Sequence, residues 1–138
     1  MNDNDWVKDI SNMQYKYKTK LWMYENRNNP EALAKYLEFR INFLKEELDE
    51  TTTAVLNNDA EEIVDGLIDL CVVAIGTLDA FGVDANEAWN EVLKANLSKE
   101  VGIKPERPNP LNLPDLIKPE GWVAPSHKGN HGNFPNDI

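Results

Sequence analysis

A chain of 138 residues has the length of one domain, and its 41% hydrophobic and 28% charged residues argue against wholesale disorder. The net charge of -10 repels a phosphate backbone, so we expect no nucleic acid partner and regard a cation as the better ligand. The single cysteine, Cys71, excludes an internal disulfide, and its place in an apolar run predicts a buried thiol in a reducing compartment.

Residues 5 to about 28 are predicted to form a helix or a broken helix, because apolar side chains recur there every three or four positions. Two asparagines and Pro30 interrupt the pattern, and Pro30 suits the first position of a new helix, where a missing N–H costs nothing. From Pro30 to about Leu56, apolar residues return at helical spacing. This stretch predicts one long helix.

A third helix is predicted from about Ala60 to Phe81, with Asp59 as its N-cap. This helix is apolar on nearly every side, which predicts a central place in a bundle. A fourth helix is predicted from Ala85 to about Lys99.

The segment after Gly102 holds seven of the eight prolines, so we expect no regular structure there and find no strand pattern. Its apolar residues suggest that the first half packs on the bundle, while the last dozen residues fray. The predicted architecture is all-α, with a helical domain over residues 1–102 and an irregular, proline-rich tail over residues 103–138.

Neither a leader nor a membrane span is expected. The N-terminus lacks the basic and apolar regions of a signal peptide, and the apolar stretch around 67–78 is interrupted by Asp69 and too short for a bilayer. We therefore expect a cytoplasmic protein without a membrane partner.

Acidic residues on the second and third predicted helices carry the chemical signal. Glu47 and Glu50 project about 60° apart on one helix, and Asp65 and Asp69 lie about one turn apart on the next, which has no Lys or Arg. Uncompensated charges on an apolar helix are costly, so a basic partner, protonation or a metal must neutralise them. An all-oxygen cage formed by the four acids would suit Mg²⁺, whereas a solvated acidic surface is the alternative.

Softer metals are not expected, because His127 and His131 lie in the tail, where exposure to solvent is their simplest explanation. Mg²⁺ held by carboxylates is suited to polyphosphate chemistry. No glycine-rich phosphate loop, kinase motif or Ser/His/Asp set accompanies the acids, so the metal and a few basic side chains must hold the phosphates.

The stretch Glu46-Glu47-x-x-Glu50, followed by Glu62-x-x-Asp65, resembles the EExxE and ExxD signature of the all-α nucleotide pyrophosphohydrolases. This group includes MazG, the dimeric dUTPases and phosphoribosyl-ATP pyrophosphohydrolase. The resemblance covers about residues 37–122 and is closest to the short MazG-like proteins of bacteriophages.

One departure from the family pattern concerns the third helix. Counted back from the following turn, the family's aspartate aligns with Asp69, which leaves Gly66 where the family has glutamate. Asp65 would then supply the missing carboxylate from one turn earlier. We therefore expect both aspartates to bind the metal and keep Glu62 as a further candidate.

The resemblance implies a four-helix core, a homodimer or homotetramer, and Mg²⁺- or Mn²⁺-dependent hydrolysis of (deoxy)nucleoside triphosphates to monophosphate and pyrophosphate. Residues 1–102 would be the catalytic domain. The implied site is made of catalytic Glu46 and Glu47, the metal-binding acids Glu47, Glu50, Asp65, Asp69 and Glu62, and substrate-binding Asn96, Lys99, Lys118 and Trp122.

Other functions and roles remain open from the sequence. The same cage would serve a dUTPase-type or phosphoribosyl-ATP-type enzyme, and a non-catalytic helical interaction module would carry the acids as a solvated face. Asn96 and Lys99 equally fit an ordinary helix end, and Trp122 equally fits a core anchor for the tail.

Overall fold

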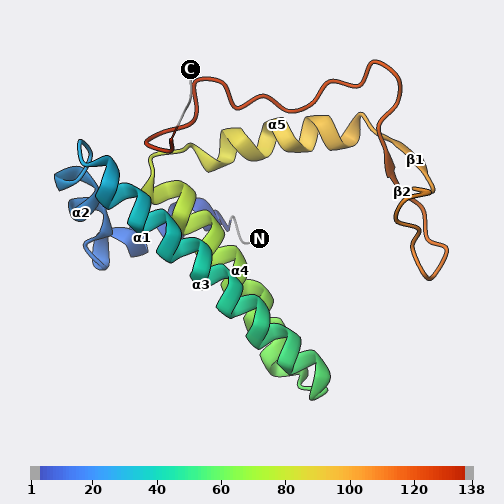
Figure 1. Cartoon of the computed structure of the whole chain (residues 1–138), viewed down its shortest axis with the longest axis horizontal. Coiled ribbons are helices and arrows are strands. Elements are labelled where there is room, and N and C mark those ends of the chain that lie inside the picture. The colour runs from blue at the N-terminus through green and yellow to red at the C-terminus, as the bar shows by residue number, and fades with distance from the viewer. Residues whose placement is uncertain (1–3, 136–138) are drawn as a thin grey trace. The chain divides into compact units, whose positions relative to one another are not determined.

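Helices make up most of residues 4–135, the part of the chain that the structure, a computed structural model, describes (Figure 1). The elements are α1 (Trp6–Lys16), α2 (Thr19–Glu25), α3 (Pro30–Leu56), α4 (Ala60–Ala80), α5 (Ala85–Leu97), β1 (Glu100–Gly102) and β2 (Asp115–Ile117). The predicted all-α class is confirmed. The chain forms two compact units, one of residues up to Ala85 together with those from His131 onward, the other of Asn86–Asn130.

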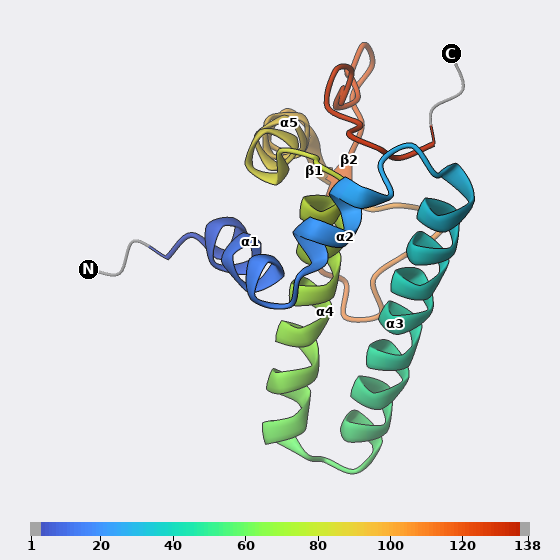
Figure 2. The ribbon, with the colours of Figure 1, turned by 90° about the vertical axis from the view of Figure 1, so that its left-hand side faces the viewer.

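Helices α3 and α4 form a long antiparallel hairpin in the first unit (Figure 2). Side chains cap both N-termini: Asn29 accepts a hydrogen bond from the Ala32 N–H and Asp59 accepts one from the Glu62 N–H, both at 3.2 Å. Pro30 is the first residue of α3, as predicted. These local signals explain why the predicted bounds of both helices agree with the structure to within one residue.

The hairpin is packed closely where Gly66 of α4 faces Thr51 of α3. Both residues are buried, and a Cβ built on Gly66 would overlap the Thr51 hydroxyl. That hydroxyl donates a hydrogen bond to the Glu47 carbonyl at 2.8 Å. The glycine therefore permits a short distance between the two helices next to the predicted metal ligands.

The first predicted helix is broken in two. Lys18 has a left-handed backbone conformation (φ 64°), which ends α1 and redirects the chain into α2. Both helices pack against α4. The predicted single apolar stripe is only partly buried. Because the helix is broken at Lys18, Ile10 and Met23 are buried while Tyr17 and Leu21 remain exposed.

The core of this unit lies near the end of α4. It consists of Met23, Leu33, Ala80 and Phe81, with Trp22, Tyr36, Leu37 and Phe134 packed around them. Phe134 stacks on Phe81 with ring centroids 4.3 Å apart, and the Asn133 N–H donates to the Phe81 carbonyl at 2.7 Å. The last dozen residues, 127–138, were predicted to fray, but these contacts hold residues 131–135, and the Asn130 N–H closes a turn on the His127 carbonyl at 2.9 Å. Residues 136–138 lie outside the described residues.

Two expectations for α4 are wrong in the single chain. Its first half is not central, since Val64, Leu67 and Ile68 are 64%, 53% and 42% exposed, and the thiol of Cys71 is exposed rather than buried. The physical reason is that, among the described residues of the first unit, α3, α1 and α2 cover other sides of α4 and leave this apolar face exposed.

The second unit begins with α5 and continues into a short antiparallel pair, β1 with β2, that the sequence did not predict. Glu100 stands opposite Ile117 and Gly102 opposite Asp115. The chain then returns along α5, where the Trp122 indole N–H donates to the Ala95 carbonyl at 2.8 Å (Figure 1). The boundary between the units, after Ala85, differs from the predicted domain boundary at residue 102.

No single helix within residues 4–135 is both long and apolar enough to cross a membrane. Helices α4 and α5 meet that test of length and composition only when taken together, as a bent pair.

Candidate active site

Carboxylates from α3 and α4 meet at one pocket of the first unit. Glu47 and Asp69 both line a cavity of about 290 Å³ that is also bordered by α1. Glu47 lies on α3 one turn before Thr51, and Asp69 lies on α4 just after Gly66, so the close helix contact brings their helix faces together. The antiparallel hairpin therefore produces the pairing of acids that the spacing predicted.

The pKa of Glu47 shows that further acids surround it. Partial burial raises this pKa above its ordinary value, because burial disfavours the charged form, and repulsion from Glu50, Asp69, Asp65 and Glu46 raises it further. No cation contributes to the shift. The other three predicted principal ligands, Glu50, Asp65 and Asp69, thus lie close enough to Glu47 to repel its charge, and no basic side chain lowers the pKa of Glu47.

The donor chemistry of this cluster fits a hard divalent ion. Carboxylate oxygens are the ligands that Mg²⁺ and Mn²⁺ prefer, and an uncompensated group of acids gains from a bound cation. In their present positions, no three Asp, Glu, His or Cys side chains of residues 4–135 converge closely enough to hold a metal ion. Side-chain rotation would have to complete the cage, and the ligand assignment stays a prediction.

The structure also describes the surroundings of the two aspartates, Asp65 and Asp69, that can be aligned with the family's aspartate on α4. Gly66 is buried against Thr51, where no larger side chain fits without a shift. Asp69 lines the pocket and raises the pKa of Glu47 more than Asp65 does. Glu62 is exposed in the first turn of α4 and does not contribute to that shift, so it lies at the margin of the cluster.

The other end of the pocket carries polar groups that sequence analysis missed. Arg40 of α3 donates from Nε to the Thr77 hydroxyl and from Nη2 to the Val73 carbonyl, both at 3.0 Å. Gln14 of α1, which is buried, donates from Nε2 to the Gly76 carbonyl at 2.8 Å. A Cβ on Gly76 would lie 2.9 Å from Arg40 Nη2, so the glycine makes room for the guanidinium.

These groups could have been noticed in part from spacing. Arg40 precedes Glu47 by seven residues, which places both on the same face of α3, and Gln14 is a polar residue four positions after buried Ile10. Spacing alone does not show that the two side chains meet at α4.

The pocket therefore combines acidic, basic and amide side chains with apolar ones. Its other lining residues are the apolar Ile10, Met13, Phe43, Val72 and Val73, the polar Tyr17 and Thr19, and Gly76. Since the Gly76 carbonyl can only accept, the Gln14 amide nitrogen must face it, and the Gln14 carbonyl oxygen is left as an acceptor. Such a pocket can hold a ligand that is ionic at one end and planar with hydrogen-bonding groups at the other.

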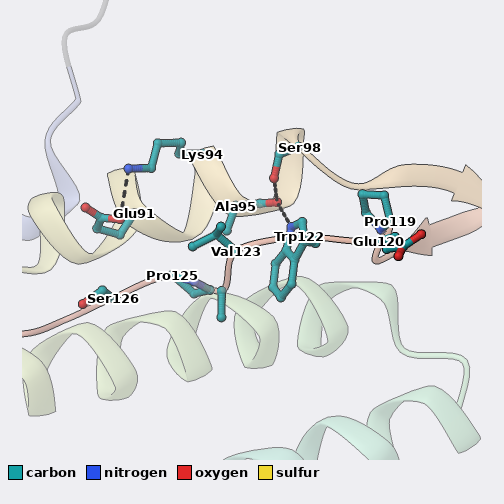
Figure 3. A pocket seen from close by; sticks show the side chains of 12 residues that line it. Glu91, Lys94, Ala95, Ser98, Pro119, Glu120, Trp122, Val123, Pro125 and Ser126 are labelled. Carbon is teal, nitrogen blue, oxygen red and sulfur yellow. Dashed lines mark hydrogen bonds and ion pairs between the residues drawn. The ribbon is translucent and has the colours of Figure 1, made fainter.

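The predicted substrate-binding residues lie in the second unit. The ammonium groups of Lys99 and Lys118 are each 5.2 Å from the centroid of the Trp122 ring, so the structure brings these three together. Figure 3 shows the Trp122 indole held against α5 by its hydrogen bond to Ala95. Asn96 is half-buried in α5, and its carbonyl accepts the Lys99 N–H at 3.1 Å.

Comparison with known proteins identifies a family. The sequence profile described as phosphoribosyl-ATP pyrophosphohydrolase (PRA-PH) matches residues 19–96. Neither the curated proteins nor the solved structures gave a significant match. The matched residues run from α2 into α5 and include the acids of the α3–α4 hairpin. Because the match covers more than half of the chain, the protein belongs to the PRA-PH family, an all-α family of enzymes that hydrolyse nucleotide pyrophosphate bonds.

Proposed function

We propose that this protein hydrolyses (deoxy)nucleoside triphosphates to the monophosphate and pyrophosphate with Mg²⁺ or Mn²⁺ as cofactor. The observation that carries the proposal is the group of carboxylates around Glu47. Burial raises the pKa of Glu47, repulsion from Glu50, Asp69, Asp65 and Glu46 raises it further, and within residues 4–135 no Lys or Arg forms an ion pair with these acids. The group borders a pocket of about 290 Å³. The divalent ion that accompanies the triphosphate would supply the positive charge that the acids need.

Four acids have the role of metal ligands in this proposal: Glu47, Glu50, Asp65 and Asp69. When bound, the metal would neutralise the phosphate oxygens and favour ionisation of the attacking water. Glu46 and Glu47 have the catalytic role of orienting that water and accepting its proton, and Glu62 contributes from the margin of the cluster. Water would cleave the bond between the α- and β-phosphate groups.

The nucleoside would occupy the rest of the pocket. Arg40 and Glu47 are seven residues apart on α3, a rise of about 10 Å, which is the scale of a nucleotide. With the phosphates at the acids, the base would reach Gln14 and Arg40 and lie between Met13 and Phe43. Arg40 would donate to a base carbonyl and the Gln14 oxygen would accept a base N–H.

Residues of the second unit are proposed to contact the nucleotide as well. Asn96, Lys99, Lys118 and Trp122 would bind it, with Lys118 and Trp122 in a segment that closes over the substrate. The contact between both lysines and the indole supports a shared role for the three side chains.

Two other substrate classes use the same chemistry. The matching profile carries the name phosphoribosyl-ATP pyrophosphohydrolase, which favours that substrate as the second candidate, and a dUTPase-type specificity is the third. Membership of an enzyme family argues against a purely non-catalytic interaction module.

An assay of pyrophosphate release tests this function. The substrates are a panel of ribo- and deoxyribonucleoside triphosphates that includes dUTP, together with phosphoribosyl-ATP, each with and without Mg²⁺. We expect release from at least one nucleoside triphosphate, and only with the divalent ion. A protein that releases pyrophosphate only from phosphoribosyl-ATP would replace our first choice with the second. Absence of release from every substrate would refute the proposed function.

The protein is further proposed to act as a homodimer or homotetramer in the cytoplasm, which would be the host cytoplasm if the gene belongs to a phage. The exposed apolar face of α4 supports assembly, because a helix of this kind normally has a neighbour. The resemblance to short phage MazG-like proteins supports the proposed origin.

A further inference from the structure

A second hollow of the first unit, of about 600 Å³, lies at the corner between α1 and α2. The corner forms because Lys18 has a left-handed backbone conformation (φ 64°), which is unfavourable for a lysine. Strained backbone of this kind clusters at ligand-binding sites. None of the predicted metal ligands lines this hollow, so it is a different cavity from the pocket at Glu47.

Aromatic rings form most of the walls of the hollow. Trp22 of α2 and Tyr36 of α3 are half-buried, and their ring centroids are 5.2 Å apart. The Tyr36 ring lies 6.0 Å from the ring of fully buried Phe81, so the core fixes this inner wall. Tyr17 and Leu21 form the outer wall and are 63% and 55% exposed. The hollow thus has fixed aromatic faces inside and adjustable side chains toward solvent.

The charges at the hollow balance each other. Among residues 4–135, Lys18 and Glu25 are the charged residues that line it, one of each sign. Aromatic faces without net charge gain most from stacking against a flat, uncharged group. A phosphate gains little there, because the carboxylate offsets the ammonium group.

The hollow adjoins the pocket in which the base is proposed to lie. Tyr17 and Thr19 line both cavities, and the Thr19 hydroxyl contacts the Tyr36 phenol. Gln14 and Arg40, the side chains proposed to contact the base, line the pocket together with them. Because Tyr17 is mostly exposed, its ring can rotate without loss of buried contacts. A group attached to the far edge of the base therefore has a short route to the aromatic walls.

We propose that the hollow binds a flat, uncharged substituent on the nucleobase, so that the substrates of this protein are nucleoside triphosphates with an enlarged base. The inference rests on the proposed function, which puts the phosphates at the acids and the base at Gln14 and Arg40. Trp22 and Tyr36 stack on the substituent, and Leu21 covers it from outside. An unmodified base leaves the hollow unfilled, so a substituted nucleotide gains contacts that its parent lacks.

Paired substrates test the hollow: dUTP and ATP, each with and without a phenyl group on the base edge away from the sugar. For at least one base, we expect wild type to have a kcat/KM about fivefold or more higher for the phenyl form, the effect of one aromatic stacking contact. Phosphoribosyl-ATP is the comparison, because its base substituent carries a phosphate. A gain over ATP from the phosphoribosyl group but not from the phenyl group would overturn the uncharged class.

Two variants assign the gain to the hollow. Trp22→Leu should bring the ratio of the two kcat/KM values close to one, and Leu21→Ala, at an exposed position that tolerates truncation, should lower it in part. The ratio is compared because a general loss of activity affects both substrates alike. Tyr24→Ala is the matched control: Tyr24 is an aromatic residue of α2, is 64% exposed and lines neither cavity, so this variant should keep the wild-type ratio.

The proposal is overturned if wild type hydrolyses the phenyl forms of both bases no faster than their parents, or if neither Trp22→Leu nor Leu21→Ala changes the ratio. A second copy of the chain is the other occupant that an aromatic hollow can take. In that case Trp22→Leu lowers the mass in light scattering and leaves the ratio unchanged, which also overturns the proposal.

Calorimetry with non-hydrolysable forms of the same pairs separates this inference from the proposed function. Tighter binding of a phenyl form, weakened in Trp22→Leu, by a protein that hydrolyses none of the substrates would refute the proposed function and keep the hollow. Hydrolysis of the parent nucleotides without any preference for a phenyl form, in rate or in binding, would refute the hollow alone.

Discussion

Asp69 tests the candidate site at the scale of a single residue, because it lines the pocket with Glu47 and raises the pKa of that residue. We expect Asp69→Asn to lower kcat at least about 10²-fold, the scale at which loss of a major electrostatic contributor registers. Steady-state pyrophosphate release measures the effect. Asp49→Asn is the control, since Asp49 is exposed on α3 outside the candidate site, and near wild-type turnover of Asp69→Asn would contradict the assignment.

The raised pKa of Glu47 predicts a pH-dependent stability of the metal-free protein. The folded state holds this proton above the ordinary pKa of 4.5, so the contribution of Glu47 to stability is greatest below that pH and falls as pH rises through the folded-state pKa. Glu47→Gln removes the charge and should raise the melting temperature in chelator at about pH 7. Thermal melts of both proteins across the acid range measure this difference.

Glu31→Gln is the matched control for that comparison. Glu31 is exposed and pairs with Lys35, so its replacement should not stabilise the protein. A lower melting temperature of Glu47→Gln than of wild type in chelator would contradict the repulsion argument.

Added Mg²⁺ should reverse the repulsion among the same acids. We expect it to raise the melting temperature of wild type, because a ligand that binds only the folded state stabilises it, and to do so less for Glu47→Gln. A titration at matched ionic strength measures the shift. No shift for wild type would indicate a solvated acidic surface.

At the scale of elements, the contact between α3 and α4 depends on Gly66. Gly→Ala in an exposed helix interior stabilises by about 1 kcal/mol, but here the new Cβ would overlap the Thr51 hydroxyl. We expect Gly66→Ala to lower the free energy of unfolding by about 1–3 kcal/mol, the usual cost of overpacking. Denaturant unfolding measures the change.

A second substitution separates overlap from other effects of the alanine. Thr51→Ala removes the atom nearest to the new Cβ, so it should cost less in the Gly66→Ala background than in wild type. Additive losses in this double-mutant cycle, or a stabilised Gly66→Ala protein, would show that the helices do not meet closely at this point.

At the scale of the whole molecule, the apolar face of α4 predicts self-association. Leu67 lies on that face and is 53% exposed in the single chain. We expect wild type to be at least a dimer at micromolar concentration and Leu67→Glu to be a monomer, because a charge in an apolar interface is costly. Light scattering gives the masses.

Val101→Glu is the control for assembly, since Val101 is exposed on β1 and lies outside the α4 face. It should retain the wild-type mass. The Cys71 thiol gives an independent measurement of assembly, because it is exposed in the single chain. It should react slowly with a thiol reagent in wild type and faster in Leu67→Glu. A wild-type monomer would refute the assembly.

Local features of the sequence determined the bounds of the long helices and the helix faces on which the acids lie. The bounds of α3 and α4 follow from Pro30, the Asn29 and Asp59 caps and the apolar spacing, all of which act within a few residues. The same spacing placed the acids of each helix on one face, and an antiparallel hairpin leaves few ways to pair them. For this reason the acids around Glu47 were predictable.

The tertiary structure decided which faces meet. Arg40 and Gln14 became parts of the pocket only because α1 crosses α4 at Gly76, and Lys99 and Lys118 approach the same Trp122 ring only because the chain turns back after β1. The exposure of the apolar face of α4 likewise depends on which parts of α4 the helices α1 and α3 contact. Local propensity acts over a few residues, whereas these contacts join segments far apart in the chain, so they depend on packing that no single segment specifies.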